Sequence, residues 1–435
     1  MSSNYNSLLE KIRNHQFTIA VVGLGRVGLP LACVYAVKGV NVIGVDVNSD
    51  LVDKINKLET PFQEALLDDY LKDATKRGKL KTTTDLSSAI KQADVIIITV
   101  GTPITEDFRP DYSQFYSALE DITQNLHSGV LIIIRSTVPP KTVGGITKQL
   151  IESKIGYTLD KEFWLATCPE RICEGKAIEE LLELPEIIGG ASEASSFLAA
   201  ELFKILNPRK KMLLTNSCIA ELAKLFTNAY RYVNFALANE FGIIAEECGV
   251  DGREVIRIAN EGYKRGGIPL PGLTGGPCLS KDGYFLTASF SYTDLIRVAW
   301  NLNESIPGYI IRKIKNILNR PLLKMKATVL GIAYKAAVDD TRYSPAMKLV
   351  NYLKMEGCDV RVHDPYIQNT LSLRDASKEA ELVILAMNHP EFKKLVIKDL
   401  ANLVKKDCLV VDCWGIWNAD EVRKRGLRYM AFGGA

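Results

Sequence analysis

The residues best suited to chemistry lie in a glycine-rich stretch at 275–282, which reads GGPCLSKD. It places the thiol of Cys278 shortly before an ammonium at Lys281 and a carboxylate at Asp282. A thiol is only partly ionised at neutral pH, but it is strongly nucleophilic and a nearby cation activates it. The stretch therefore predicts a nucleophile that attacks an electrophilic carbon such as that of an aldehyde.

A second pattern, GLGRVG at 23–28, is typical of a dinucleotide-binding turn. It follows an apolar run at 17–22 and opens a segment of helical composition, which is the context that such a turn requires. Gly23 permits a tight turn, Gly25 lets the backbone approach a pyrophosphate, and Gly28 lets the helix pack on the strand. The pattern predicts a bound dinucleotide.

The strand after this turn ends in a carboxylate at Asp46. A carboxylate at that place accepts hydrogen bonds from an adenosine ribose and repels a 2'-phosphate, so NAD is favoured over NADP. Loops that end later strands carry Thr102 and Thr137, and ligands of such sheets bind beyond the carboxyl ends of the strands. The predicted cofactor contacts are Gly23, Gly25, Arg26, Val27, Gly28, Asp46, Thr102 and Thr137.

The elements that must position these residues follow from the apolar pattern. Apolar runs alternate with helical segments up to about residue 205 and again after 324, which predicts βαβ units and parallel sheets. We expect an α/β fold in which two Rossmann-like doubly wound domains are joined by a central helical domain. The domains are predicted at 1–205, 206–320 and 321–435. Strands are predicted at 17–22, 40–45, 94–100, 130–134, 163–167, 186–189, 327–330, 382–386 and 409–411.

One long helix is predicted from 216 to 248, where apolar residues recur at three- and four-residue steps. A helix of this length exceeds one domain core, so we expect it to join domains and to pack against a second copy of the chain in a homodimer. Another face carries Glu221, Lys224, Asn228 and Arg231 at helical spacing. That row is either a solvated face or, because of its lysine and asparagine one turn apart, part of a catalytic site.

Two cations, Lys335 and Arg342, precede a predicted helix that starts at Ser344 and Pro345. Serine caps a helix and proline fits its first turn, and a helix N-terminus attracts phosphate. The two cations therefore either hold a diphosphate or are ordinary surface charges.

Composition narrows the class of protein. The 435 residues are 47% hydrophobic and carry a formal net charge of only +3, with both signs spread along the chain. No apolar run approaches the roughly 18 residues that a membrane span needs, and no N-terminal segment resembles a signal peptide. We expect a cytoplasmic protein that binds neither membrane nor nucleic acid. The nine cysteines form no CxxC pair and the four histidines lie far apart, so neither a metal site nor a disulfide framework is predicted.

Six motifs, taken in order, resemble the UDP-glucose/GDP-mannose dehydrogenase family over nearly the whole chain. They are the glycine fingerprint, Ser-Thr-Val-Pro at 136–139, Pro-Glu-Arg at 169–171, Ala-Glu-Leu-Ala-Lys-Leu-Phe-Thr-Asn at 220–228, the cysteine stretch, and Gly-Ile-Ala-Tyr-Lys with Asp-Asp-Thr-Arg-Tyr-Ser-Pro at 331–345. The resemblance implies an NAD-binding domain, a central dimer-forming domain and a C-terminal domain that binds the nucleotide of a UDP-sugar. It also implies two successive oxidations at C6 of the sugar.

The resemblance further implies roles for particular residues. Cys278 would attack the aldehyde to form a thiohemiacetal and then a thioester, while Lys224 and Asn228 would stabilise negatively charged oxygens. Asp282 would orient Lys224 or a water, Glu170 would be the general base for thioester hydrolysis, and Thr137 would hold that water. The implied substrate contacts are Glu170, Arg171, Lys224, Asn228, Arg231, Arg265, Lys335 and Arg342.

The motifs disagree about the sugar. The segments at 169–190 and 228–234 resemble the branch that acts on UDP-N-acetylhexosamines, above all UDP-N-acetylmannosamine, whereas the pair at 281–282 resembles the UDP-glucose branch. UDP-glucose and UDP-N-acetylglucosamine therefore remain alternatives. The segment at 263–271 matches neither branch; Arg265 is the candidate for its sugar-contacting cation, with Lys264 the alternative.

Two other classes of function can be weighed against this one. A single-step dehydrogenase of the 3-hydroxyacid type also joins a Rossmann domain to a long helix, but it has no use for Cys278 or for a third domain. A non-catalytic sensor of nucleotide-sugars would be expected to lack the thiol or the helix lysine, and Cys278 and Lys224 are both present.

Overall fold

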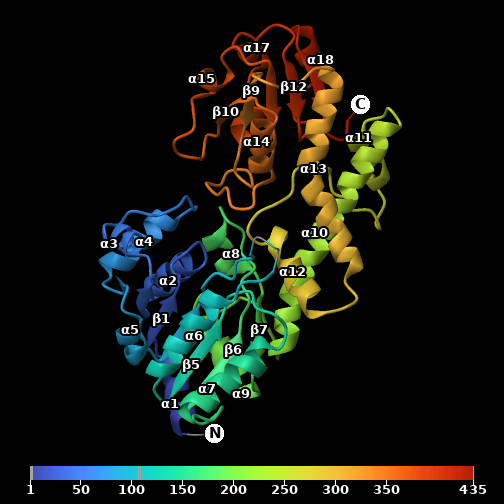
Figure 1. Ribbon diagram of the computed structural model, residues 1–435. Helices are drawn as coiled ribbons and strands as arrows, with labels where there is room; N and C mark the ends of the chain where they lie inside the picture. The colour runs from blue at the N-terminus through green and yellow to red at the C-terminus, as the bar shows by residue number, and fades with distance from the viewer. Residues whose placement is uncertain (1–2, 106, 108, 435) are drawn as a thin grey trace. The chain divides into compact units, whose positions relative to one another are not determined.

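A computed structural model describes residues 3–105, 107 and 109–434 (Figure 1). The chain divides into two compact units, Met1–Thr227 with Tyr284–Ser289, and Asn228–Gly283 with Phe290–Ala435. The boundaries fall inside helices α10 and α12, which therefore contribute residues to both units. The domains predicted at 1–205, 206–320 and 321–435 remain a prediction.

The first unit is built on an eight-stranded sheet in the order β3-β2-β1-β4-β5-β6-β7-β8. Neighbouring strands are parallel except β6 and β7, which pair antiparallel. The strands are β1 Thr18–Val22, β2 Asn41–Val45, β3 Leu80–Thr83, β4 Val95–Ile98, β5 Val130–Ile134, β6 Phe163–Thr167, β7 Glu186–Gly190 and β8 Met212–Asn216.

Helices cover both faces of this sheet. Successive residues of a strand point to opposite faces, and here they enter two different cores. Ile19 and Val21 of β1 belong to one buried cluster, and Ala20 and Val22 belong to another. The helices of this part are α1 Ser3–Arg13, α2 Gly28–Val37, α3 Ser49–Asn56, α4 Leu67–Lys76, α5 Leu86–Gln92, α6 Ser113–Asn125, the π-helix η1 Thr142–Thr147, α7 Lys148–Ile155, α8 Ala177–Glu183 and α9 Glu193–Lys204.

The central helices are α10 Ser217–Glu247, α11 Gly252–Asn260, α12 Leu279–Ser289 and α13 Asp294–Leu318. A buried amide pair ties α10 to α13, since Asn239 Nδ2 donates to Asn303 Oδ1 at 2.9 Å. Asn239 Oδ1 also accepts from the backbone N–H of Gly272 at 2.8 Å. The loop that leads to Cys278 is therefore fastened to the long helix within the second unit.

The C-terminal part carries a five-stranded parallel sheet in the order β10-β9-β11-β12-β13. Val383 and Ile384 of β11 enter opposite cores, so this sheet is also covered on both faces. Its strands are β9 Lys326–Leu330, β10 Asp359–His363, β11 Leu382–Leu385, β12 Leu409–Asp412 and β13 Arg428–Ala431, and its helices are α14 Pro345–Met355, α15 Leu373–Ser377, α16 Pro390–Lys393, α17 Ile397–Ala401 and α18 Ala419–Lys424.

The α/β class is confirmed: two separate sheets in N- and C-terminal regions are joined by central helices. Four strands that the sequence did not predict, β3, β8, β10 and β13, all lie at sheet edges. Because an edge strand packs against fewer neighbours, it carries polar residues that dilute the apolar signal. Within the described residues, no helix is both long enough and apolar enough to cross a membrane.

Candidate active site

The predicted cofactor turn has the geometry that a pyrophosphate requires. Gly23 has a φ of 97°, in the region that favours glycine, and a β-carbon at Gly28 would lie 1.8 Å from the Gly23 carbonyl oxygen. A β-carbon at Gly25, by contrast, would meet no atom within 4 Å. The first and third glycines are thus needed by the turn itself, and the second leaves open space where a ligand can approach the backbone.

Asp46 links the end of β2 to this turn. Its Oδ2 accepts from the Leu24 N–H at 2.8 Å and its Oδ1 accepts from the Asn48 N–H at 3.0 Å. Arg26 of the same turn pairs with Glu174 at 3.6 Å, and its guanidinium lies 5.0 Å from the centre of the Phe62 ring. Val27 is the N-cap residue of α2.

The loops after β4 and β5 are bonded to each other, because Thr102 Oγ1 donates to the Thr137 carbonyl at 2.8 Å. Further along the second loop, the buried Glu221 of α10 accepts from the backbone N–H groups of Lys141 at 2.6 Å and Val143 at 2.8 Å. Burial raises the pKa of the Glu221 carboxyl to about 7 despite these bonds. Glu221 thus anchors the loop that carries Thr137.

Glu170 takes part in a buried network of charges. Its Oε2 accepts from the Arg135 guanidinium, and its Oε1 accepts from the backbone N–H groups of Arg171 at 2.7 Å and Ile172 at 2.9 Å. Burial opposes ionisation of Glu170, but the Arg135 charge and these hydrogen bonds outweigh it, so the pKa of Glu170 lies below its usual range. Glu170 is therefore a carboxylate at neutral pH.

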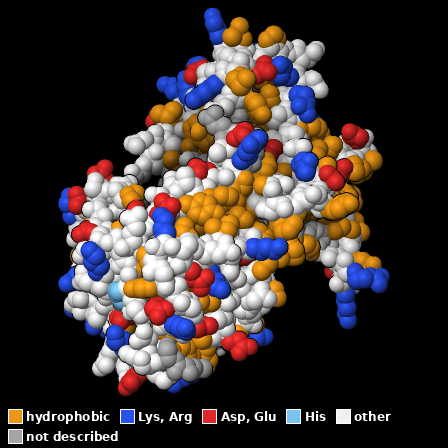
Figure 2. Space-filling view, turned by 60° about the horizontal axis from the view of Figure 1, so that its bottom comes forward, with side chains coloured by type: hydrophobic (Ala, Val, Ile, Leu, Met, Phe, Trp, Pro, Cys, Tyr) orange, Lys and Arg blue, Asp and Glu red, His pale blue; other side chains and the backbone are white. Residues whose placement is uncertain are grey.

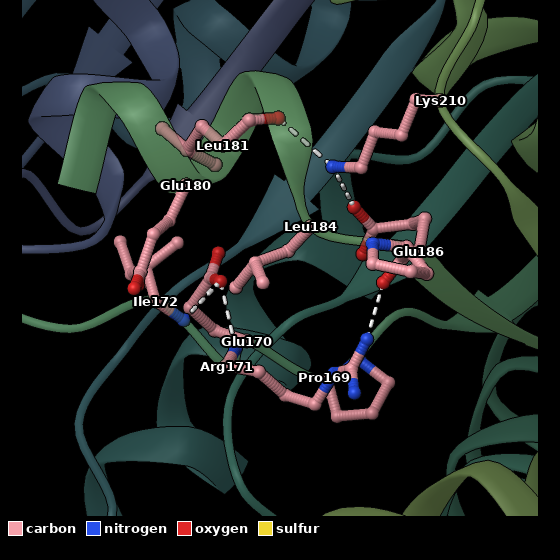
Figure 3. Close-up of a pocket in the computed structure, with 10 residues that line it drawn as sticks. Pro169, Glu170, Arg171, Ile172, Glu180, Leu181, Leu184, Glu186 and Lys210 are labelled. Carbon is pink, nitrogen blue, oxygen red and sulfur yellow. Dashed lines mark hydrogen bonds and ion pairs between the residues drawn. The ribbon is translucent and has the colours of Figure 1, made fainter. Parts of the chain in front are cut away.

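The same network extends from Arg135 to Glu186 and Lys210, and Figure 3 draws the last two of these residues. Arg135 Nη1 donates to Glu186 at 3.0 Å, and Lys210 donates to the other oxygen of Glu186 at 2.7 Å and to the Leu181 carbonyl at 2.8 Å. Each buried charge thus has an opposite partner, as burial requires. Arg171 instead donates to the carbonyl of Pro185.

Lys224 is buried, with 7% of its surface exposed. Among the described residues of its own unit, none accepts a hydrogen bond from its ammonium. A largely buried lysine is suited to stabilise an oxygen that gains negative charge.

In the second unit, Asn228 and Asp282 hold the helix that follows the thiol. Asn228 Nδ2 donates to Asp282 Oδ2 at 2.6 Å, and Lys281 Nζ lies 3.2 Å from Asp282 Oδ1. Asp282 is fully buried. Its carboxylate is thus shared between an amide of α10 and the lysine beside it.

The thiol of Cys278 is exposed, in contrast to most other cysteines. Burial raises the pKa of Cys33 and of Cys408 to about 12 and that of Cys358 to about 11, which keeps these thiols protonated and inert. No group of three or more His, Cys, Asp or Glu residues in the described part of the chain could hold a metal ion.

Sequence comparisons identify the family. Models of the UDP-glucose/GDP-mannose dehydrogenase family match the chain three times: the NAD binding domain at 17–207, the central domain at 219–305 and the UDP binding domain at 328–419. The chain belongs to the UDP-glucose/GDP-mannose dehydrogenase family. It is an NAD-dependent nucleotide-sugar dehydrogenase with a UDP-sugar-binding domain.

Relatives of known name cover nearly all of the chain. The UDP-N-acetyl-D-mannosamine dehydrogenase of Methanocaldococcus jannaschii is 37% identical over 95% of this chain and 96% of its own length. The NDP-N-acetyl-D-galactosaminuronic acid dehydrogenase of Ralstonia solanacearum is 33% identical over 92% and 96%. The solved structure of the UDP-D-ManNAc dehydrogenase of Pyrococcus horikoshii superposes with a TM-score of 0.89, at 35% identity, over 96% of this chain and 99% of that one.

The remaining implied substrate contacts of this dehydrogenase lie in the second unit, each in its own local surroundings. Arg342 pairs with Asp340, with Nη2 to Oδ2 at 2.6 Å, and Lys335 lies half-buried in the loop after β9. Arg231 is exposed on α10, and Arg265 is exposed and donates to the Tyr263 hydroxyl at 2.9 Å.

Sequence reasoning missed two charged residues, Arg135 and Glu174, and it named Glu221 only as part of the polar row of the long helix, without its role as an anchor of the loop. The one local signal for Arg135 is a cation directly after the apolar run VLIII of β5. Such a charge must find a buried partner or point out of the sheet.

Proposed function

We propose that this enzyme oxidises C6 of a UDP-N-acetylhexosamine, with UDP-N-acetyl-D-mannosamine converted to UDP-N-acetyl-D-mannosaminuronate, through covalent intermediates on Cys278. The observation that carries the proposal is the exposed thiol in a chain that also has an NAD turn with room at Gly25. The names of the relatives, which act on N-acetylated sugars, support the choice of sugar.

The NAD turn is suited to its cofactor: Gly23, Gly25 and Gly28 would form the cradle of the pyrophosphate, and Asp46 would accept from the ribose. NAD, when bound, supplies the hydride acceptor for both oxidations. Lys224 and Asn228, one turn apart on α10, stabilise negative charge on the C6 oxygen during the first oxidation and in the later tetrahedral intermediates.

Cys278 acts after the first oxidation. Its thiolate adds to the aldehyde carbon to give a thiohemiacetal, which loses a hydride from C6 to become a thioester. Water then attacks the thioester carbon, the C–S bond breaks, and the sugar carboxylate leaves with the thiolate restored. The acyl carbon therefore stays on the protein until it is fully oxidised.

Glu170 and Thr137 assist the hydrolysis of the thioester. Glu170 takes a proton from the attacking water, and Arg135 keeps it ionised and orients it for this task. Thr137 helps to hold the water. Asp282 positions Asn228 through the 2.6 Å hydrogen bond between their side chains.

The proposed enzyme is a homodimer that acts in the cytoplasm. Exposed apolar residues along α10, including Phe226, Tyr230 and Leu237, are suited to a homodimer interface. Broad apolar areas are visible on the face of the molecule drawn in Figure 2. We place the enzyme in the cytoplasm, where it would supply a uronic acid for polysaccharide biosynthesis.

The test is a substrate panel. Purified enzyme with NAD is offered UDP-N-acetylmannosamine, UDP-N-acetylglucosamine, UDP-glucose and GDP-mannose while NADH is followed. We expect UDP-N-acetylmannosamine to react fastest and to yield two NADH per sugar, because the thiol retains the aldehyde for a second oxidation. One NADH per sugar with accumulating aldehyde would contradict the two-step mechanism. A clear preference for UDP-glucose, which Lys281 and Asp282 leave open, would move the enzyme to the UDP-glucose branch.

A further inference from the structure

We infer that His389 is a positioning residue that holds the loop at 331–344 in the conformation that positions Cys278. Binding of the nucleotide half of the substrate to this loop therefore changes the reactivity of the thiol. The inference rests on the proposed function for the role of Cys278, and it adds a coupling between two parts of the substrate site. The loop leaves the carboxyl end of β9, inside the segment matched by the UDP binding domain.

His389 is fully buried and makes two directed contacts. Its Nδ1 lies 3.1 Å from the backbone nitrogen of Ala337, and its Nε2 lies 3.2 Å from Oδ2 of Asp364. A backbone N–H can only donate, so Nδ1 must accept and the ring proton must sit on Nε2, from which it is donated to Asp364. The ring also stacks on Tyr366, with centroids 4.8 Å apart. His389 therefore connects Ala337 to Asp364 through a ring of fixed orientation, in addition to packing in the core.

The two contacts fasten the loop at two points. The same Oδ2 of Asp364 accepts from the N–H groups of Ile332 at 2.7 Å and Ala333 at 3.0 Å, which fastens the start of the loop. Ala337 has a φ of 59°, in the left-handed region that alanine seldom adopts unless its surroundings hold it there. The hydrogen bond to His389 supplies that hold in the middle of the loop.

The far end of this loop contacts the stretch that carries the thiol. The Gly276 N–H donates to the Tyr343 carbonyl at 3.1 Å. A β-carbon at Gly276 would lie 2.2 Å from the Tyr334 ring, and one at Gly275 would lie 2.5 Å from the Tyr343 carbonyl oxygen. The glycine pair is thus needed for close packing against the loop, and Cys278 follows two residues later. A change in the loop must move the backbone that carries the thiol.

Two substitutions separate the anchoring role of His389 from simple packing. The amide of asparagine places an oxygen near the position of Nδ1, so His389→Asn keeps an acceptor for Ala337. The amide of glutamine reaches the position of Nε2, so His389→Gln keeps the donor to Asp364 but loses the acceptor. Both variants replace the imidazole ring by an amide side chain, so each is a control for the loss of the ring in the other.

The experiment measures UDP affinity by calorimetry and the rate at which iodoacetamide alkylates Cys278, read by peptide mass, with and without UDP. In the wild type we expect UDP to change the Cys278 rate at least about threefold. His389→Gln should weaken UDP binding by about tenfold, equivalent to the loss of one hydrogen bond, and should abolish the UDP effect on Cys278. His389→Asn should retain both properties, and in every variant NAD affinity and alkylation of the exposed Cys248 should be unchanged.

A variant on the thiol side guards against a general folding defect. Gly276→Ala should remove the effect of UDP on Cys278, because a β-carbon 2.2 Å from the Tyr334 ring forces the thiol stretch and the loop apart, and an unchanged NAD affinity would show that the variant is folded. The inference is overturned if UDP leaves the wild-type Cys278 rate unchanged, if His389→Gln behaves as wild type, or if both His389 variants are equally impaired. Failure of the proposed function is read separately, as absence of NADH from every UDP-sugar in wild-type enzyme.

Discussion

Glu170 and Cys278 have different roles in the proposed reaction, one as a base and one as a nucleophile, and their surroundings differ accordingly. Cys278 is exposed on a glycine-rich loop, as a nucleophile must be. Glu170 is held by the Arg135 guanidinium and two backbone N–H groups, which keep it charged at neutral pH. A carboxylate held in this way is ionised at neutral pH and can therefore act as a base. Its lowered pKa also makes it a weaker base than a carboxylate in apolar surroundings.

The hydrolytic role of Glu170 is tested by Glu170→Gln. Both hydrides can still leave, but hydrolysis should slow by roughly 10²- to 10⁴-fold, so the thioester accumulates on Cys278 and adds the mass of the UDP-sugar acyl group to the intact protein. The control is the double variant with Cys278→Ser, which should show no adduct. An adduct on another cysteine would remove Cys278 from the mechanism. Unchanged NAD and UDP affinities would show that the variant remains folded.

Cofactor choice is a second property of one residue, Asp46. Its carboxylate both repels a 2'-phosphate and accepts from the N–H groups of Leu24 and Asn48. Asp46→Asn removes the charge but keeps an acceptor, so kcat/KM for NADP relative to NAD should rise at least about tenfold, or about 1.4 kcal/mol. Asp46→Ala also loses the acceptor and should be less stable. Equal use of NAD and NADP by the wild type would show that the carboxylate does not select.

At the scale of elements, the cofactor turn depends on how closely α2 approaches β1. Gly28 is the first residue of α2, and its α-carbon faces the carbonyl of Gly23 too closely for any side chain. Gly25 lies in the same turn but faces open space. The two glycines therefore serve different needs, one of the fold and one of the ligand.

This difference predicts distinct outcomes for two alanine variants. Gly28→Ala should destabilise the protein by at least about 1–3 kcal/mol and abolish NAD binding, because strand and helix must separate. Gly25→Ala should melt within about 2 °C of wild type but bind NAD at least about tenfold more weakly, since its methyl group occupies the space of the pyrophosphate. Thermal unfolding and NAD titration of both variants check this. NAD affinity at the wild-type level in Gly25→Ala would place the cofactor elsewhere.

At the scale of the whole molecule, α10 exposes apolar side chains at intervals of about one or two turns. Phe226, Tyr230, Leu237 and Ile244 are each more than 40% exposed. A contiguous apolar row on a soluble protein commonly marks an interface with another protein, and a second copy of the chain is the partner that we propose.

The proposed dimer is tested by adding one charge to this row. Leu237→Glu should convert a dimer into a monomer at micromolar concentration, because a carboxylate buried at the interface lacks a partner. The matched control is Thr75→Glu, which adds the same charge to the exposed Thr75 of α4 and should leave the dimer intact. Light scattering after size exclusion measures both. A wild-type protein that is monomeric would refute the proposed interface.

The sequence by itself determined the features that depend on short-range spacing. The glycine turn, the long helix and the buried strands are read from residues a few positions apart, and backbone geometry turns such spacing directly into structure. The same holds for the exposed thiol, whose glycine neighbours announce a loop. The edge strands β3, β8, β10 and β13 were not predicted because polar residues interrupt their short apolar runs, so no regular apolar pattern marks them.

Only the tertiary structure decided which polar side chains bond to distant parts of the chain. Arg135 pairs with Glu170, 35 residues away, Glu221 anchors a loop about 80 residues earlier, and His389 bonds to Ala337, 52 residues before it. Such contacts depend on strand order and on which loops share a sheet edge, and no local pattern encodes either. The thiol was visible in the sequence, but the packing of its loop against the segment at 331–344 was not.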